Sequence, residues 1–129
     1  MKISKKTINS YESTYKDGYD KGYPSIELVR LEKLFFNQIS GNVLDFGCGP
    51  GTNGIHLLKK GYHVTFCDIS EYALKKVRKK IKLNKIRKNY KIVNLSKNKN
   101  FFRHKSSVFD YIICFSVFTE ESVKLKVND

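Results

Sequence analysis

Residues 43–51 read VLDFGCGPG, an apolar run that ends in a glycine-rich turn. A short hydrophobic run without polar alternation is typical of a parallel strand that is buried on both faces. Glycine in the turn after such a strand lets a ligand approach the backbone, because no side chain blocks its path. Residues 52–60 then have the pattern of a helix, which Gly61 closes. The stretch predicts a strand, a ligand-binding turn and a crossover helix in succession.

Strands and helices alternate on both sides of this stretch. A helix is predicted for residues 25–39, and Ser70 caps another helix whose apolar residues share one face. Strands are predicted for residues 42–46, 62–67, 90–95 and 109–118, and the last of these is the strongest. Strands that alternate with helices imply a parallel sheet with right-handed crossovers.

A carboxylate follows the second predicted strand. Asp68 stands at the tip of that strand, where a carboxylate can accept hydrogen bonds from both hydroxyls of a ribose. Residues 49–54 read GPGTNG, and Asp68 lies 19 residues beyond Gly49, which is also the spacing of a dinucleotide-binding site. Two features disfavour a pyrophosphate: Pro50 removes an N–H donor, and Asp45 places a carboxylate just before the turn. This combination favours an adenosine ligand that carries an ammonium and a sulfonium group.

Residues 43–51 resemble motif I of the class I S-adenosylmethionine-dependent methyltransferases, and Asp68 matches the acidic residue after the second strand of that family. The Phe109-Asp110 pair resembles the start of the family's fourth strand. Residues 15–20 are similar to the N-terminal flap segment of many small-molecule methyltransferases. The resemblance covers roughly residues 12–120.

The resemblance implies S-adenosyl-L-methionine as the cofactor and a set of residues that hold it. The resemblance places Asp45 at the methionine ammonium, Gly47, Gly49 and Gly51 along the methionine and ribose, Asp68 at the ribose hydroxyls, Ile69 on the adenine, and Asn94 with Leu95 near the adenine amino group. The residues also have plainer interpretations. Asp45 can simply cap the glycine turn, and Asp68 with Ser70 can form an ordinary strand-to-helix turn.

Two departures from the family pattern affect these expectations. Asn94 stands where the family often has an acidic residue, although an amide oxygen can still accept a hydrogen bond from the adenine amino group. The sheet of the family has seven strands, whereas this chain ends just after the fourth. We therefore expect a truncated chain without the parts that complete the substrate pocket, and the catalytic residues stay unknown.

The charge of the chain is strongly basic and uneven. The formal net charge is +13, and no acidic residue occurs between Glu71 and Asp110. One interpretation is a surface for a polyanion such as RNA. The interpretation that we favour is a solvated face, because Lys75, Lys76, Lys79 and Lys80 lie opposite the apolar stripe of their own helix. Nucleic acid is thus the less favoured partner.

Composition excludes several other classes of protein. No run reaches the ~18–20 apolar residues of a membrane span, and residues 1–24 lack the apolar core of a secretory signal. The three cysteines form no ligand spacing for a metal, and their odd number disfavours a disulfide framework. We expect a cytoplasmic protein that has no metal site and no membrane partner.

The predicted fold is α/β: a partial, Rossmann-like parallel sheet with flanking helices and strand order 3-2-1-4. Residues 1–24 are predicted to form an N-terminal flap segment, and residues 25–129 a partial methyltransferase domain. The expected function is S-adenosylmethionine-dependent methyl transfer to a small-molecule acceptor. The alternatives are a truncated, non-catalytic remnant that binds the cofactor and a basic RNA-binding or RNA-methylating module. An unpaired edge of the sheet also predicts self-association.

Overall fold

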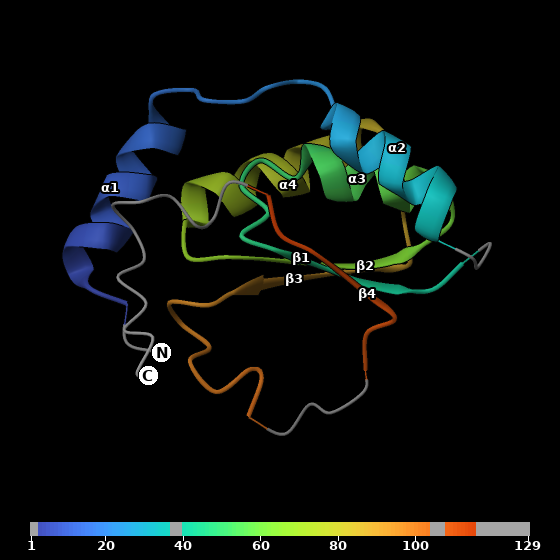
Figure 1. The fold of residues 1–129 in the computed structure, drawn as a ribbon. Coiled ribbons are helices and arrows are strands. Elements are labelled where there is room, and N and C mark those ends of the chain that lie inside the picture. Colours follow the sequence, from blue (N-terminus) through green and yellow to red (C-terminus); the bar gives the residue numbers. More distant parts are fainter. Residues whose placement is uncertain (1–2, 37–39, 104–107, 116–129) are drawn as a thin grey trace.

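The computed structural model describes residues 3–36, 40–103 and 108–115. It shows four strands and four helices within these ranges (Figure 1). In chain order they are α1 (Lys5–Lys16), α2 (Ile26–Phe35), β1 (Asn42–Phe46), α3 (Thr52–Lys59), β2 (His63–Asp68), α4 (Glu71–Leu83), β3 (Tyr90–Asn94) and β4 (Tyr111–Ile113). The strands form one sheet in the order β3-β2-β1-β4, and each neighbouring pair is parallel. The predicted fold class and strand order are confirmed.

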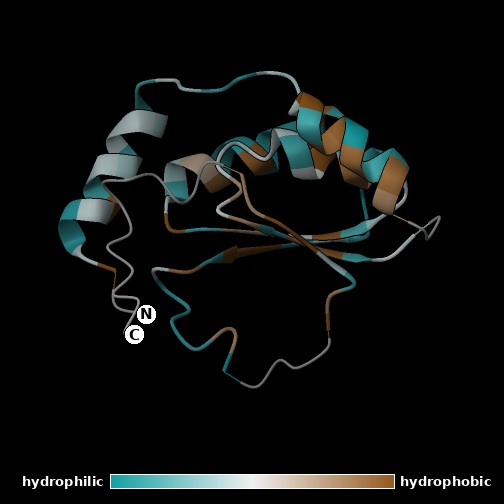
Figure 2. Ribbon diagram, in the orientation of Figure 1, coloured by the Kyte–Doolittle hydropathy of each residue, from teal (hydrophilic) through white to brown (hydrophobic). Residues whose placement is uncertain are grey.

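Helices α2, α3 and α4 cover one face of the sheet, and the main apolar core lies between them and the strands (Figures 1 and 2). Alternate strand residues point into this core, among them Val43, Val64 and Phe66, each at most 1% exposed. Leu57 of α3 and Val77 of α4 close the core from the helical side and are fully buried. The amphipathic pattern of each crossover helix thus anchors it on the sheet.

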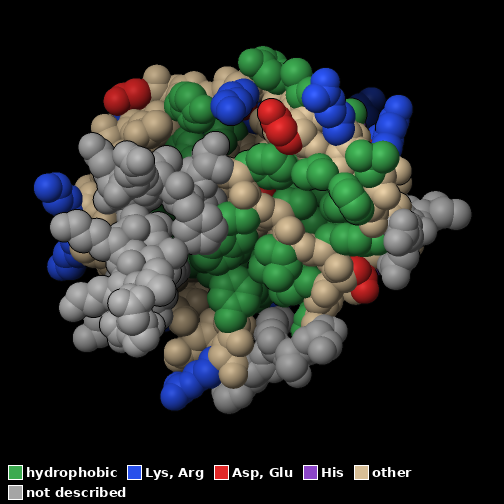
Figure 3. Space-filling view, in the orientation of Figure 1, with side chains coloured by type: hydrophobic (Ala, Val, Ile, Leu, Met, Phe, Trp, Pro, Cys, Tyr) green, Lys and Arg blue, Asp and Glu red, His purple; other side chains and the backbone are tan. Residues whose placement is uncertain are grey.

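The opposite face of the sheet carries a second apolar cluster, and none of the described helices covers it. Its buried members are Leu44, Cys67, Val93 and Leu95, with Phe46, Ile69, Phe101 and Phe109 packed against them. Residues 96–103 lie on this side, below the strands in Figure 1. Ile112 of β4 points to the same face and is 66% exposed. Hydrophobic side chains also reach the surface in the middle of Figure 3, over the region where β4 lies in Figure 1.

The fourth strand is shorter than the sequence predicts. It spans Tyr111–Ile113, whereas the prediction was 109–118, of which residues 116–118 lie outside the described residues. Asp110 precedes the strand and binds the start of β1: its Oδ2 accepts from the Asn42 N–H at 2.7 Å, and its own N–H donates to the Asn42 carbonyl at 2.8 Å. Because the Asn42 N–H donates to the Asp110 side chain, the regular pairing of β1 with β4 begins one residue later, at Val43 and Tyr111.

The N-terminal part differs from prediction in two ways. Residues 5–16 form helix α1, which was not predicted from the sequence. Ser4 caps this helix, because its hydroxyl oxygen accepts a hydrogen bond from the Thr7 N–H at 3.1 Å. The helix predicted for residues 25–39 ends at Phe35. Phe36 is extended, and its ring stacks on Tyr111 at 4.0 Å between centroids, which draws the chain out of the helix. Residues 37–39 lie outside the described residues.

Candidate cofactor site at the carboxyl edge of the sheet

The glycine-rich turn after β1 has a backbone that only glycine adopts easily. Gly47, Gly49 and Gly51 have φ values of +66°, +53° and +82°. Left-handed backbone costs a residue with a Cβ about 1–2 kcal/mol. At Gly51 an added Cβ would also lie 2.7 Å from Cγ2 of Val77, so α4 packs directly against the turn. The turn therefore presents bare backbone at the carboxyl end of β1.

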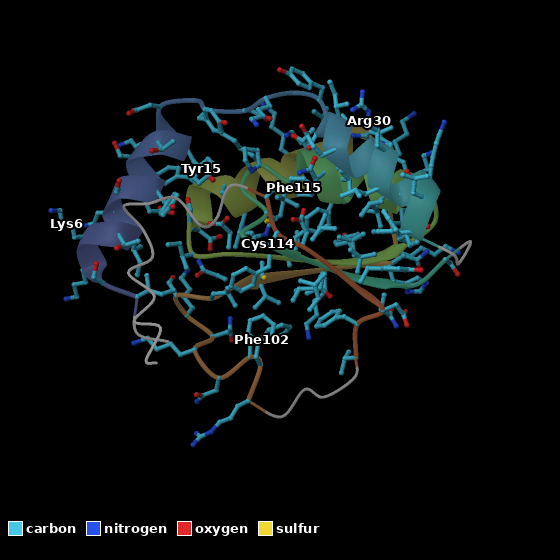
Figure 4. All side chains as sticks on the ribbon, in the orientation of Figure 1. Lys6, Tyr15, Arg30, Phe102, Cys114 and Phe115 are labelled. Carbon is cyan, nitrogen blue, oxygen red and sulfur yellow. The ribbon has the colours of Figure 1, made fainter. Side chains whose placement is uncertain are left out.

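Helix α1 covers this turn through Tyr15. The Tyr15 hydroxyl would lie 2.9 Å from a Cβ built on Gly49, so the two residues are in close contact. Figure 4 shows Tyr15 between α1 and the start of α4. Burial raises the pKa of Tyr15, and the negative charge of Asp68 adds to the shift. Tyr15 is therefore a neutral hydroxyl at physiological pH, close to the turn and to Asp68.

Asp68, at the end of β2, holds the turn in place. Its Oδ2 accepts a hydrogen bond from the Gly49 N–H at 2.8 Å, and its Oδ1 accepts from the Ser70 N–H at 2.9 Å. Burial raises the pKa of Asp68, although these N–H donors oppose the shift. Each carboxylate oxygen has a further lone pair, so Asp68 can still accept hydrogen bonds from the hydroxyls of a ligand.

Asp45, in β1, is a buried carboxylate that is only partly satisfied. The residue is 3% exposed, and its Oδ2 has no hydrogen-bond partner among the residues that the structure describes. Burial raises the pKa of Asp45 to about 7; the peptide group of Gly54 opposes this shift, and Asp68 adds to it. A Cβ on Gly54 would lie 2.7 Å from the unpaired oxygen, so the carboxylate faces the first turn of α3. The position suits the capping interpretation and also places negative potential beneath the glycine turn.

The adenine-side residues lie at the same edge, but the Asn94 amide is already engaged. Its Nδ2 donates to Glu71 Oε2 at 2.7 Å, and its Oδ1 accepts from the Ser96 N–H at 2.9 Å and from the Ser96 hydroxyl at 2.5 Å. Ile69 and Leu95 belong to the second apolar cluster, and the Leu95 N–H donates to the Asp68 carbonyl at 2.8 Å. The structure therefore offers an apolar wall there, with no free amide oxygen.

Two residues near the turn were not predicted to belong to the site. Tyr15 was assigned only to a flap segment, although tyrosines at positions 11, 15 and 19 have the spacing of one helical face. Lys80 was assigned to a solvated face, but its Nζ lies 3.0 Å from the Pro50 carbonyl and 3.1 Å from the Thr52 hydroxyl. No local pattern in the sequence distinguishes Lys80 from its basic neighbours.

Comparison with known proteins decides the family of this chain. Residues 44–121 match the family model described as a methyltransferase domain, and this match covers more than half of the chain. The chain belongs to the class I S-adenosylmethionine-dependent methyltransferase family.

Several relatives of this methyltransferase-family chain share its central region. An uncharacterized methyltransferase of Schizosaccharomyces pombe is 38% identical over 90 residues, which are 70% of this chain and 58% of that protein. The tRNA (uracil(54)-C(5))-methyltransferase of Pyrococcus horikoshii is 40% identical over 61 residues, 46% of this chain and 15% of that enzyme. A solved structure from work on the conversion of a disulfide bond into a thioacetal group during echinomycin biosynthesis is 30% identical. Its TM-score is 0.58, and the match covers 67% of this chain and 40% of that chain.

The family implies a cofactor of the S-adenosylmethionine type, and most of the residues at the edge fit it. A cationic ligand at the edge would favour the ionised form of Asp45, whose Oδ2 has no partner among the described residues, and Asp68 retains acceptor capacity for hydroxyls. The left-handed turn lets a ligand lie against the backbone. Asn94 fits less well, because its amide oxygen already accepts two hydrogen bonds.

Two other site classes receive no support from the described part of the chain. Residues 3–36, 40–103 and 108–115 contain no group of three or more His, Cys, Asp or Glu side chains that could hold a metal ion. The same ranges contain no helix that is long and apolar enough to span a membrane.

Proposed function

We propose that this chain binds S-adenosyl-L-methionine at the carboxyl edge of the sheet and forms the cofactor-binding part of a methyltransferase that acts on a small molecule. The observation that carries the proposal is the pair of buried carboxylates, Asp45 and Asp68, on either side of a left-handed glycine turn. Carboxylates in such burial cost stability unless something compensates for them. A cationic ligand with ribose hydroxyls compensates for both.

Each residue of the edge has a defined part in this proposal. Asp68 accepts the ribose hydroxyls while its bonds to Gly49 and Ser70 keep the turn ordered. Asp45 supplies negative potential for the cationic end of the ligand. The cofactor supplies a methyl group on a sulfonium, and transfer of that group depends largely on how the two reactants are positioned. Tyr15 covers Gly49 and limits the access of water to this part of the site.

The small-molecule acceptor is favoured by the cover that α1 forms over the turn. Tyr11, Tyr15 and Tyr19 form a row of rings, with centroids 6.5 Å and 6.3 Å apart, beside the turn. Such a narrow aromatic wall suits a small acceptor better than a folded polynucleotide. One structural relative comes from work on the conversion of a disulfide bond into a thioacetal group during echinomycin biosynthesis, and its description mentions no nucleic acid.

Methylation of RNA is the second candidate, and the charge of the chain favours it. Eleven of the lysines and arginines in residues 72–103 are exposed, while two lysines of α4 are partly buried. The exposed ones are Lys75, Arg78, Lys79, Lys82, Lys85, Arg87, Lys88, Lys91, Lys97, Lys99 and Arg103. The tRNA methyltransferase relative is aligned over less than half of this chain, so its substrate gives only weak support.

Transfer of a radiolabelled methyl group from S-adenosyl-L-methionine separates these candidates. One cell extract is divided into a small-molecule fraction and a total RNA fraction, and each is incubated with the chain and with the Asp68→Ala variant. The proposal expects label in the small-molecule fraction only, and none with the variant. Label in RNA alone would establish the second candidate. Cofactor binding without label in either fraction would establish a non-catalytic binding protein.

A further inference from the structure

One face of α4 serves as a docking strip for the N-terminal segment of the chain. Three residues of α4 spaced four apart each hold a different point of that segment. The contacts are Tyr72 N–H to Glu12 Oε1 at 3.3 Å, Lys76 Nζ to the Tyr19 carbonyl at 3.3 Å, and Lys80 Nζ to Asp20 at 2.8 Å. Lys76 and Lys80 are four residues apart, so their side chains share one face of the helix. The Tyr72 contact comes from its backbone N–H in the first turn of α4, so the three contacts follow one another along the helix.

Lys80 differs from the other two residues because it also holds the cofactor turn. Its ammonium group lies 2.8 Å from both carboxylate oxygens of Asp20. The same ammonium donates to the Pro50 carbonyl at 3.0 Å and to the Thr52 hydroxyl at 3.1 Å. A lysine has three N–H donors, so these three partners satisfy it fully. Its side chain is only 23% exposed, which strengthens the charge interactions relative to an open surface pair.

Asp20 belongs to residues 17–25, the strap that joins α1 to α2. Its carboxylate also accepts hydrogen bonds from the Gly22 N–H at 3.1 Å and from the Thr52 hydroxyl at 3.3 Å. Gly18 and Gly22 flank it with φ values of +101° and +72°, and a Cβ on either would meet open space. These glycines are therefore needed for the left-handed backbone that bends the strap, and not for close packing against a neighbour. Lys76, Lys80 and Thr52 hold the middle of the strap on the core. Asn53 holds its end, where the Asn53 Oδ1 accepts a hydrogen bond from the Ser25 N–H at 2.8 Å.

We propose that Lys80 is a positioning residue that latches the N-terminal segment onto the cofactor turn, so that closure of α1 and binding of an adenosyl ligand are coupled. The inference rests on the proposed function and adds a device that regulates the same site. Tyr15, which precedes the strap, covers Gly49. Release of the Lys80 contacts frees the strap and lets Tyr15 leave the turn. A ligand held beneath the closed segment exchanges slowly while the latch is intact.

Hydrogen exchange measured by mass spectrometry tests the latch without any ligand. The variants are Lys80→Met, which removes the ammonium, and Asp20→Asn, which removes only the charge of its partner. The control is Lys79→Met, because Lys79 is exposed and makes no hydrogen bond or ion pair within the described ranges. We expect amides of residues 11–22 to exchange about tenfold faster in both latch variants, the scale of one charge-assisted hydrogen bond, and unchanged in the control.

Ligand kinetics provide the second readout. S-adenosylhomocysteine should leave the two latch variants about tenfold faster than the unmodified chain, on the same energy scale. Unchanged exchange in residues 11–22 would overturn the latch, as would an equal increase over the whole chain, which indicates global destabilisation. If the unmodified chain binds no adenosyl ligand, the proposed function fails, and hydrogen exchange alone decides the latch. If Lys80→Met does not fold, Asp20→Asn carries the test.

Discussion

The core beneath α2–α4 and the carboxyl edge of the sheet are both buried, but the core contains apolar side chains and the edge contains two carboxyl groups. In the core, Leu57, Phe66 and Val77 are fully buried and apolar, and they follow the periodicity of their elements. At the edge, Asp45 and Asp68 are almost as deeply buried, and burial raises the pKa of each. Local rules are broken in natural proteins mainly where function requires it. The difference separates the part of the chain that supplies stability from the part that we propose binds a ligand.

The largest effect is expected from the core. Leu57→Ala should lower the free energy of unfolding by about 2–5 kcal/mol, because it leaves a cavity beneath α3. The affinity of the remaining folded molecules for an adenosyl ligand should not change, since Leu57 lies away from the glycine turn. Urea unfolding and calorimetry measure the two quantities. If the variant binds the ligand more weakly under conditions in which all of it is folded, the core and the carboxyl edge do not act independently.

At the edge, the expected effect is on binding. Asp68→Ala should weaken the binding of S-adenosylhomocysteine by ~1.5–3 kcal/mol, the range for hydrogen bonds to a charged group. Asp110→Ala is a matched control, because Asp110 also accepts a backbone N–H, that of Asn42, but precedes its strand. The control should bind the ligand as the unmodified chain does. Equal losses in both variants would remove the special role of the carboxyl edge.

The pH dependence of stability sharpens the comparison through Asp45. Burial raises its pKa from 3.8 to about 7, so the folded chain retains a proton there that the unfolded chain releases. The carboxyl group therefore lowers stability progressively as the pH rises from about 4 to about 7. Asp45→Asn removes this loss. Relative to the unmodified chain, the variant should gain about 2–3 kcal/mol in the free energy of unfolding between pH 5 and pH 8. A stability difference between variant and unmodified chain that is the same at pH 5 and pH 8 would contradict the raised pKa of the buried Asp45 carboxyl group.

Much of the fold was predictable because the sheet and its crossover helices carry strong local patterns. Strand β1 and Ser70 at the start of α4 were predicted at the observed residues. Helix α1 was missed because none of its residues is buried, and its sequence is polar except for Ile8, Tyr11 and Tyr15. The fourth strand was predicted too long, since a run of apolar residues shows no end by itself. Its end depends on contacts with β1 that are distant in sequence.

The site was predictable where function follows directly from strand ends. Asp45, Asp68 and the glycines lie where the chain leaves a strand, so sequence order alone brings them to one edge. Their roles at a ligand remain predictions. The direction of the Asn94 amide depends on Glu71 and Ser96, and no sequence pattern shows that choice of partners. The same holds for Lys80, whose partners come from three separate parts of the chain.

The smallest effect is expected on the face of the sheet that the described helices leave open. The two neighbouring isoleucines of β4 differ, because Ile113 is buried against the main core and is only 6% exposed. Ile112 is 66% exposed, so Ile112→Thr should change the free energy of unfolding by no more than about 0.5 kcal/mol. The same variant should weaken the self-association that the sequence predicts for the unpaired edge strand, because Ile112 lies in β4 at that edge, as sedimentation would show. A large loss of stability would mean that Ile112 is covered in solution.

The central claim is that the carboxyl edge binds an adenosyl ligand with a cationic end, and titration calorimetry tests it most directly. The chain is titrated with S-adenosyl-L-methionine, S-adenosylhomocysteine and NAD at one pH and salt concentration. Asp45 and Pro50 disfavour a pyrophosphate at the turn, so both adenosyl ligands should bind more tightly than NAD. Binding of NAD that is equal to or tighter than that of the adenosyl ligands would contradict the claim.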